Sequence, residues 1–236
     1  MSVKGTAMTP PGLTELALES QQIQQQGYAL LRQAIPPTWL AGLRQAFDEG
    51  VRPSAQWPVP RGPDWRHALV DLDPKVQALC RLPPLLAVVG ALIGEDFFLA
   101  QVEGREPLGG GGYQRLHRDL SAQRPGDTVN AIAYLDDYGP ANGATRLVPA
   151  SHRGPFDAAR ADADFEAKAM QLEGKAGDIL VFDADLVHAA SVNRSGARRR
   201  SLLLGYFAKS LFGAHQQSAA LRGVRMDTSE WFPAQG

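Results

Sequence analysis

The sequence predicts a mainly β fold, a sandwich or barrel, with a helical layer formed by its N-terminal part. Apolar residues recur at helical spacing through much of residues 10–95. From about residue 96 onward, short apolar runs alternate with turns rich in Gly, Pro, Asp and Asn, as expected for many short strands. No linker separates the two parts, so we predict one domain over 1–236, with a β core over about 96–210 and a tail over 211–236.

The helical layer is predicted to contain three or four helices. The stretch "GLTELALESQQIQQQ" ends at Gly27, a stop signal, and "YALLR" follows as a strand. The stretch "PPTWLAGLRQAFDEG" begins with prolines, and its apolar residues fall on one helical face. The four prolines of residues 51–65 predict a loop. Residues 73–94 predict one or two buried helices that end at Gly94.

The β core is predicted from short apolar runs bounded by turn residues. A helical pattern over residues 156–170 interrupts them. The turns include the glycines of 109–112 and the segments 124–127, 138–144 and 193–197. The predicted strands are "FFLAQVE", "QRLHRDL", "TVNAIAYLDD", "TRLVPAS", "GDILVFDADLVHAASV" and "RRRSLLLGYF".

Charge and cysteine content narrow the possible partners and location. The net charge of −1 argues against a large basic surface for nucleic acid. The single cysteine, Cys80, forms no internal disulfide and is expected to be a small buried hydrophobe in a cytoplasmic, reducing setting. The N-terminus has no apolar core of a signal peptide, and the apolar stretch 82–94 is too short to span a bilayer. We therefore expect neither nucleic acid nor membrane as a partner.

A potential metal site is indicated by "QRLHRDL", in which His117 and Asp119 stand two positions apart. If this segment is a strand, these two side chains share a face and Arg118 points away. A later apolar run ends in "DLVHAASV" and supplies His188. Two imidazoles and one carboxylate can occupy one face of an octahedral metal and leave three positions open, as in non-heme Fe(II) oxygenases. The His-x-Asp spacing alone also arises by chance or in surface segments. Other residues of the chain must therefore show whether this motif is a metal site.

Arg199 is a candidate for binding a carboxylate-bearing co-substrate. It follows His188 by eleven residues and opens the predicted strand "RRRSLLLGYF". A guanidinium can hold a carboxylate through two parallel hydrogen bonds. Alternation along the strand turns Arg198 and Arg200 away from the face of Arg199, and we expect these two to form a solvated basic edge.

Several segments together resemble the phytanoyl-CoA dioxygenase family of Fe(II)- and 2-oxoglutarate-dependent oxygenases. They are "LHRDL", "NGATRLVPASH", "GDILVFDADLVHAASVN" and "RRRSLLLGYF", and the similarity runs through most of the chain. The resemblance implies a double-stranded β-helix, a jelly roll or cupin-like barrel. It also implies Fe(II) and 2-oxoglutarate as cofactor and co-substrate, His117, Asp119 and His188 as metal ligands, and Arg199 as the partner of the distal carboxylate of 2-oxoglutarate.

Other polar residues are weaker candidates. Gln114 has an amide that could orient a substrate or a ligand carboxylate, and it could equally face water. Asn130 lies within a predicted strand and needs a polar partner, for which the co-substrate carboxylate is one candidate. We expect His152 to be structural rather than a fourth ligand, and His67 and His215 to be ordinary surface residues.

The resemblance implies that the protein hydroxylates an unactivated C–H of a small-molecule metabolite, using O2 and releasing succinate and CO2. Desaturation, epimerisation and cyclisation by the same chemistry stay open. Halogenation is disfavoured, because related halogenases carry a small residue where Asp119 stands. A nucleic-acid demethylase is also disfavoured, since Gly205 occupies the position of a second arginine in those enzymes. A cupin-type metal-dependent isomerase or binding module is the alternative of another class, and it would have no need of Arg199.

The substrate is expected to be amino-acid-like or a natural-product intermediate. Loops 51–67 and 104–113 should frame its pocket with aromatic and basic groups, a mixture that suits an acidic or zwitterionic molecule. The tail is expected to fold over the mouth of the barrel. The pocket-framing candidates are Trp57, Arg61, Trp65, Arg66, Arg105 and Tyr113.

Overall fold

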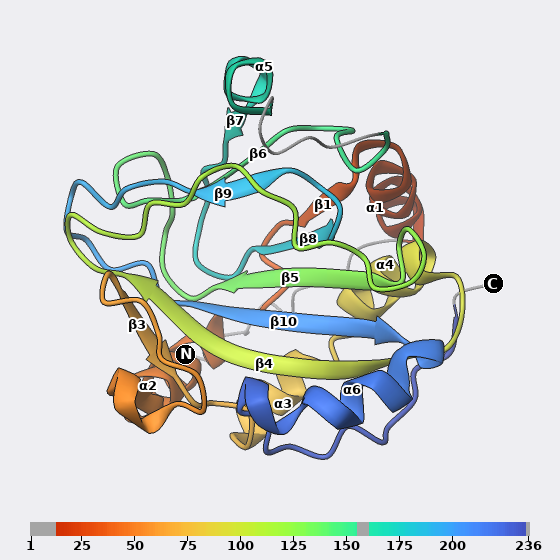
Figure 1. Cartoon of the computed structure of the whole chain (residues 1–236), viewed down its shortest axis with the longest axis horizontal. Coiled ribbons are helices and arrows are strands. Elements are labelled where there is room, and N and C mark those ends of the chain that lie inside the picture. Colours follow the sequence, from red (N-terminus) through yellow and green to blue (C-terminus); the bar gives the residue numbers. More distant parts are fainter. Residues whose placement is uncertain (1–12, 155–160, 235–236) are drawn as a thin grey trace, which may run out of the picture.

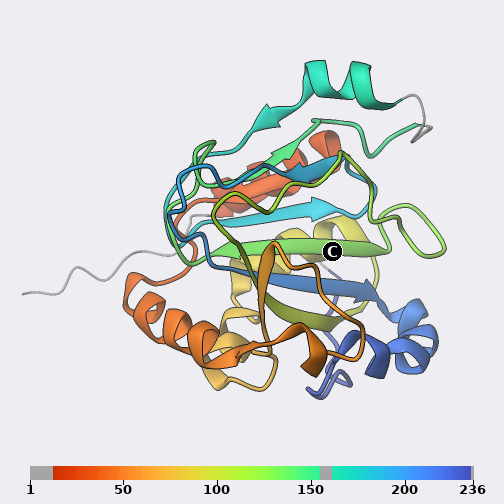
Figure 2. The same ribbon diagram turned by 60° about the vertical axis from the view of Figure 1, so that its left-hand side comes forward.

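The computed structural model describes residues 13–154 and 161–234, and in them it contains both the predicted helical layer and the β core (Figure 1). A seven-stranded antiparallel sheet has the order β1-β8-β5-β10-β4-β3-β2, and a smaller sheet has the order β7-β6-β9. The two sheets lie one above the other in Figures 1 and 2. This arrangement confirms the predicted jelly roll with a helical layer. The strands of the large sheet are β1 (Tyr28–Leu31), β2 (Val51–Arg52), β3 (Trp65–Ala68), β4 (Phe97–Pro107), β5 (Thr128–Tyr134), β8 (Ile179–Asp183) and β10 (Ser201–Ala208); those of the small sheet are β6 (Thr145–Leu147), β7 (Met170–Gln171) and β9 (His188–Ala190).

The helices begin and end where local signals predict. Proline occupies the first turn of α2, α3 and α4, where its missing N–H costs no hydrogen bond. Gly94 ends α4 in the left-handed region at φ 71°, which glycine adopts without strain. The helices are α1 (Leu13–Gln26), α2 (Pro37–Gly50), α3 (Pro74–Leu79), α4 (Pro83–Ile93), α5 (Ala161–Lys168) and α6 (Phe212–Ser218), with 3-10 turns at Ser54–Gln56, Lys209–Leu211 and Ala220–Arg222. None of the helices in the described ranges is long and apolar enough to cross a membrane.

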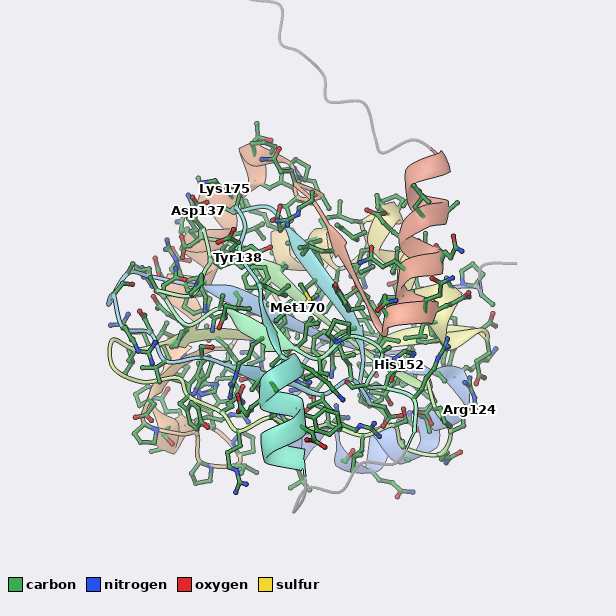
Figure 3. The ribbon with its side chains drawn as sticks, turned by 90° about the horizontal axis from the view of Figure 1, so that it is seen from above. Arg124, Asp137, Tyr138, His152, Met170 and Lys175 are labelled. Atoms are coloured by element: carbon green, nitrogen blue, oxygen red, sulfur yellow. The ribbon has the colours of Figure 1, made fainter. Side chains whose placement is uncertain are left out.

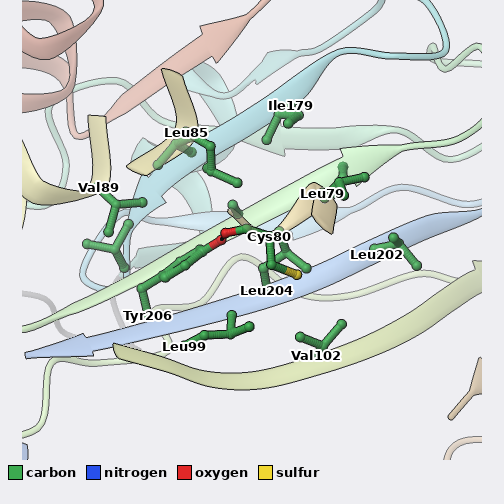
Figure 4. Packing of buried hydrophobic residues seen from close by; sticks show 14 of the residues in the cluster. Leu79, Cys80, Leu85, Val89, Leu99, Val102, Ile179, Leu202, Leu204 and Tyr206 are labelled. Atoms are coloured by element: carbon green, nitrogen blue, oxygen red, sulfur yellow. Dashed lines mark hydrogen bonds between the residues drawn. The ribbon is translucent and has the colours of Figure 1, made fainter. Parts of the chain in front are cut away.

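The main hydrophobic core lies between the large sheet and the helices that cover its outer face. Figure 4 shows this packing, in which Leu79 and Leu85 from α3 and α4 meet Leu204 of β10. The hydroxyl of Tyr206 donates a 2.8 Å hydrogen bond to the backbone oxygen of Cys80, so the one polar atom of this ring is satisfied. Burial raises the pKa of the Cys80 thiol to about 12, and this residue is therefore an inert core side chain.

A second core fills the space between the two sheets. Tyr134 and Tyr138 stack with ring centroids 3.7 Å apart, and Phe182 and Leu147 pack in the same cluster. Seen from above, Tyr138 lies near Asp137 and Lys175, whose carboxylate oxygen and amine are 2.8 Å apart (Figure 3). This inter-sheet layer supports the strands that carry the functional residues.

Two parts of the predicted organisation differ from the structure. The N-terminal part supplies three strands of the large sheet, β1, β2 and β3, whereas the sequence predicted only the first. Short strands such as β2 have too few residues to show a period of two. The tail does not cover the open end of the site described below, because Phe232 packs against Phe97 at the opposite end of β4, with ring centroids 5.4 Å apart.

Asp183 at the end of β8 yields a prediction on pH and stability. Its side chain is buried, and burial, with Asp185 adding repulsion, raises its pKa from 3.8 to about 6. The folded state therefore binds this proton more tightly than the unfolded chain, so stability falls as the pH rises from about 4 to about 6, and the full loss persists above that range. We expect Asp183→Asn to raise the free energy of unfolding by about 1–3 kcal/mol at pH 8 and by almost nothing at pH 4. Denaturant unfolding at both pH values measures this, and an equal gain at both would contradict burial as the cause.

Candidate metal centre

Three side chains that can bind a metal meet between the two sheets. His117, Asp119 and His188 each offer one ligand atom, and these atoms all lie within 4.8 Å of one another. The Nε2 atoms of His117 and His188 lie 3.5 Å and 3.6 Å from the two carboxylate oxygens of Asp119. Within residues 13–154 and 161–234, this is the one group of three or more such side chains with that geometry.

The segment that carries His117 and Asp119 is not the regular strand that the sequence predicted. It makes one bridge, in which the backbones of His117 and His188 exchange two hydrogen bonds of 3.0 Å and 2.9 Å. The chain then leaves β9, and the N–H of Asp119 donates to the carbonyl of Ala184. Leu120 follows with φ 68°, which ends the extended conformation. His117 and Asp119 nevertheless face one site, while Arg118 turns away to the carbonyls of Ser151 and Gly154.

Backbone carbonyls orient both imidazoles. Nδ1 of His117 lies 2.8 Å from the carbonyl oxygen of Arg115, and Nδ1 of His188 lies 2.9 Å from that of Leu186. A carbonyl oxygen only accepts hydrogen bonds, so each Nδ1 carries the hydrogen and each Nε2 keeps its lone pair. Both lone pairs are therefore available to a metal next to Asp119.

The electrostatics of the cluster also suit a cation. Burial lowers the pKa of His188, which favours the neutral, ligating form. Burial alone would raise the pKa of Asp119, but the hydrogen bond to His117 and the charge interactions with both histidines lower it, so this carboxylate is ionised. The hydrogen bond to Asp119 raises the pKa of His117, because the neighbouring carboxylate favours the protonated imidazole.

Asn130 holds one oxygen of Asp119. Its side-chain amide donates a 2.8 Å hydrogen bond to Asp119 Oδ2 from the middle of β5. The sequence predicted the co-substrate carboxylate as one candidate partner of this amide. In the structure the amide instead binds the carboxylate of Asp119, a potential metal ligand. A residue that orients a ligating carboxylate in this way typically tunes metal affinity.

A cavity of about 110 Å³ opens beside the three residues. Arg199 lines it at a buried position, with 2% of the residue exposed, and its Nε has no hydrogen-bond partner. Gln114 also lines it, and its side-chain oxygen accepts a 3.0 Å hydrogen bond from the N–H of Ala190. A buried guanidinium without an anion is costly, so this cavity is suited to a carboxylate. The lining also includes Trp65, Arg105, Ile132, Thr145, Phe182, Ser201 and Leu203.

Thr145 is a lining residue that the sequence analysis did not single out. The hydroxyl of Tyr134 donates to its Oγ1 at 2.9 Å, which leaves the Thr145 hydrogen free to point elsewhere. Nothing in "TRL" distinguishes this threonine from an ordinary β-strand residue. Only the pairing of β6 with β9, which carries His188, brings it to the cavity.

Arg198 and Arg200 turn away from the cavity, as alternation predicts. Arg198 is exposed, as expected, whereas the solvated position expected for Arg200 is wrong. Arg198 binds Glu106 and Asp48, and the side chain of Arg200 is 12% exposed and binds Asp136. Each guanidinium pairs with one carboxylate of low exposure, Glu106 for Arg198 and Asp136 for Arg200. The sequence could not show those partners because they lie more than 60 residues away.

The remaining histidines lie outside the cluster. His67 and His215 are buried, so the surface positions predicted for them are wrong. His67 contacts Glu103, and His215 packs against the ring of Phe98 with centroids 5.0 Å apart. His152 lies next to Gly27, close to the end of α1 (Figure 3), and is not among the ligand atoms.

Comparisons with known proteins agree with this geometry. The family model described as phytanoyl-CoA dioxygenase matches residues 23–201. The chain is 34% identical over 98 residues to "Dioxygenase FUM3" of Gibberella moniliformis, which is 38% of this chain and 31% of that protein. It is 36% identical over 96 residues to the Fe(II)/2-oxoglutarate-dependent dioxygenase nvfF of Aspergillus novofumigatus, which is 37% of this chain and 31% of that one. The matched part thus spans about a third of the length of these curated relatives.

Solved structures show the same fold. The alpha-ketoglutarate-dependent epimerase SnoN from nogalamycin biosynthesis matches with a TM-score of 0.70 at 18% identity, over 84% of each chain. HygX from Streptomyces hygroscopicus, solved with nickel, 2-oxoglutarate and hygromycin B, matches with a TM-score of 0.66 at 17% identity, over 81% of this chain and 87% of that one. At these identities the likeness extends to the fold alone.

Proposed function

Because the chain belongs to the phytanoyl-CoA dioxygenase family, we propose that it is an Fe(II)- and 2-oxoglutarate-dependent dioxygenase that acts on a small molecule. The default reaction is hydroxylation of an unactivated C–H. In that reaction substrate, O2 and 2-oxoglutarate become hydroxylated substrate, succinate and CO2, so that one oxygen atom enters each organic product.

One observation carries this proposal: a two-histidine, one-carboxylate group and a buried arginine line the same cavity. The ligand set is the one associated with non-heme Fe(II) oxygenases. The Arg199 guanidinium has an Nε without a partner, which fits a group that receives an anion. These residues therefore fit both Fe(II) and 2-oxoglutarate.

Each residue of the site has a separate task in the proposed reaction. His117, Asp119 and His188 would hold the metal from one side and leave the cavity side for other ligands. Arg199 would bind the distal carboxylate of 2-oxoglutarate through two parallel hydrogen bonds and neutralise its own buried charge. When bound, Fe(II) supplies the activation of O2 coupled to decarboxylation of 2-oxoglutarate, and the protein supplies binding and orientation.

The identity of Asp119 favours oxygen transfer over halogenation. Its carboxylate occupies the position next to both imidazoles, where a halide would need an open coordination site. Asn130 holds it there. A metal-dependent isomerase or binding module is disfavoured because it would leave the guanidinium of Arg199 buried beside the metal without a function.

We also propose a cytoplasmic location. The single cysteine, Cys80, is buried and forms no disulfide, which fits a reducing compartment.

The decisive experiment is anaerobic calorimetry of 2-oxoglutarate binding to Fe(II)-loaded protein, with metal-free protein as the control. We expect binding in the micromolar range that requires the metal, since chelation adds to the salt bridge with Arg199. Release of succinate in air, increased by the correct substrate, would then report turnover. Metal retention without 2-oxoglutarate binding would instead favour the isomerase or binding module.

A further inference from the structure

A second arginine lines the cavity, and its surroundings differ from those of Arg199. Arg199 lies at the buried end, with 2% of the residue exposed, whereas 32% of the Arg105 side chain is exposed. Both residues line the cavity that contains His117 and Asp119. Arg105 therefore lies at the open end, where a substrate would approach the metal.

Glu103 holds the guanidinium of Arg105 in place. Arg105 donates from Nε to Glu103 Oε1 at 2.8 Å, and the same carboxylate contacts His67 Nδ1 at 2.7 Å and Arg61 Nη2 at 2.9 Å. Burial would raise the pKa of Glu103, but the hydrogen bond from His67 and the charges of Arg105 and Arg61 lower it to about 2. The Glu103 carboxylate is thus ionised at any physiological pH, and the Arg105 guanidinium that binds it through Nε keeps a defined orientation.

The outer edge of the Arg105 guanidinium is available to bind a ligand. In the described part of the chain only its Nε has an acceptor, so the two Nη groups have no hydrogen-bond partner. These groups present the parallel N–H bonds that match a carboxylate or a phosphate. By contrast, Arg66 on β3 donates a hydrogen bond to Glu106, a carboxylate that also accepts one from Arg198.

The charges around Glu103 leave a positive excess. Two guanidinium groups, from Arg61 and Arg105, share the single carboxylate of Glu103. Arg61 also has a buried Nε without a partner and lies over the ring of Trp57 at 4.4 Å. Arg105 lines the same cavity as His117 and Asp119, so its positive charge lies beside the potential metal site. An anion at Arg105 would balance this excess close to the metal.

We propose that Arg105, oriented by Glu103, binds an anionic group of the substrate at the open end of the cavity, and that the substrate is therefore a small acid. This inference rests on the proposed function, because it assigns Arg199 to 2-oxoglutarate and Arg105 to the second reactant. A carboxylate and a phosphate ester share the required chemistry. The anchored group would place a C–H of the same molecule near the metal.

The test measures binding of matched probes to anaerobic protein loaded with Fe(II) and saturating 2-oxoglutarate. The probes are short-chain and N-acetylated amino carboxylic acids, each paired with its primary amide, and phosphate monoesters, each paired with the parent alcohol. We expect at least one anionic probe to bind tenfold or more tightly than its neutral partner, as measured by calorimetry. The class that shows the preference identifies the anion.

Variants then assign the preference to Arg105. Arg105→Gln should reduce the acid-to-neutral ratio to below threefold while the Kd of 2-oxoglutarate changes by less than threefold. Arg105→Lys should keep an intermediate ratio, because lysine retains the charge but not the planar fork. Arg66→Gln is the matched control and should behave as wild type. Thermal unfolding of each variant verifies that it is folded.

Two results would overturn the inference, and both differ from a failure of the proposed function. The first is wild-type protein that binds 2-oxoglutarate but shows no anionic probe binding more tightly than its neutral partner. The second is Arg105→Gln weakening 2-oxoglutarate as strongly as Arg199→Ala, which would assign Arg105 to the co-substrate. Wild-type protein that fails to bind 2-oxoglutarate at all would refute the proposed function instead.

Discussion

Replacing His188 by alanine is expected to abolish turnover by removing a proposed metal ligand. His188 is almost fully buried and its Nε2 faces Asp119, and among the described residues no fourth metal-binding side chain joins this group. The same result is expected for His117→Ala and Asp119→Ala. Fe(II) affinity should fall at least 100-fold in each variant, a loss of about 3 kcal/mol. Anaerobic titration with Fe(II), followed by metal analysis after desalting, measures this directly.

Asn130 and His152 provide a graded comparison for that experiment. Asn130→Ala removes the hydrogen bond that orients Asp119 but leaves all three ligands, so we expect a 10–100-fold loss of metal affinity. His152→Ala removes a histidine outside the cluster and should leave metal affinity unchanged. Metal binding that survives His188→Ala but is lost in His152→Ala would show that the metal centre has been misassigned.

Arg199→Ala is expected to weaken 2-oxoglutarate binding strongly while the metal stays bound. The guanidinium lies at the buried end of the cavity, and no other described arginine besides Arg105 lines it. Truncating one partner of a buried charge pair typically costs about 2–5 kcal/mol, which corresponds to a 30-fold to several-thousand-fold rise in Kd. Calorimetry with the Fe(II)-loaded variant separates this loss from any loss of metal.

Arg198→Ala is the matched control from the same segment. Arg198 binds Glu106 and Asp48 away from the cavity, so its removal should lower stability by about 1 kcal/mol and leave the Kd of 2-oxoglutarate unchanged. If Arg198→Ala or Arg200→Ala destroyed co-substrate binding while Arg199→Ala did not, the assigned register of this strand would be incorrect.

Much of the fold could be predicted because its signals are local. Proline at the first turn and glycine at the end of a helix act within a few residues, and both are visible in α4. The strands β5, β8 and β10 are long enough to show apolar runs between turns. The short strands β2 and β3 carry no such signal, because their conformation follows from pairing, β3 with β4 and β2 with β3, rather than from their own residues.

The order and spacing of His117, Asp119, His188 and Arg199 in the sequence were enough to predict a metal site with a carboxylate-binding arginine. These residues resemble a family motif, and that information lies in the chain itself. His117 and Asp119 do face one site, as predicted, but the regular strand on which that prediction rested is absent, because the segment makes only a single bridge.

Only the tertiary structure decided which polar groups meet across the sheets. It brought Asn130 to Asp119, His67 to Glu103, and Thr145 to the cavity that Arg199 also lines. It also buried His67 and His215, which the sequence placed at the surface. These contacts join residues from separate strands or from opposite sheets, and the strand order that creates them depends on burial of the whole core. A motif can name the ligands of a site, whereas the residues that orient them and select the substrate depend on this long-range packing.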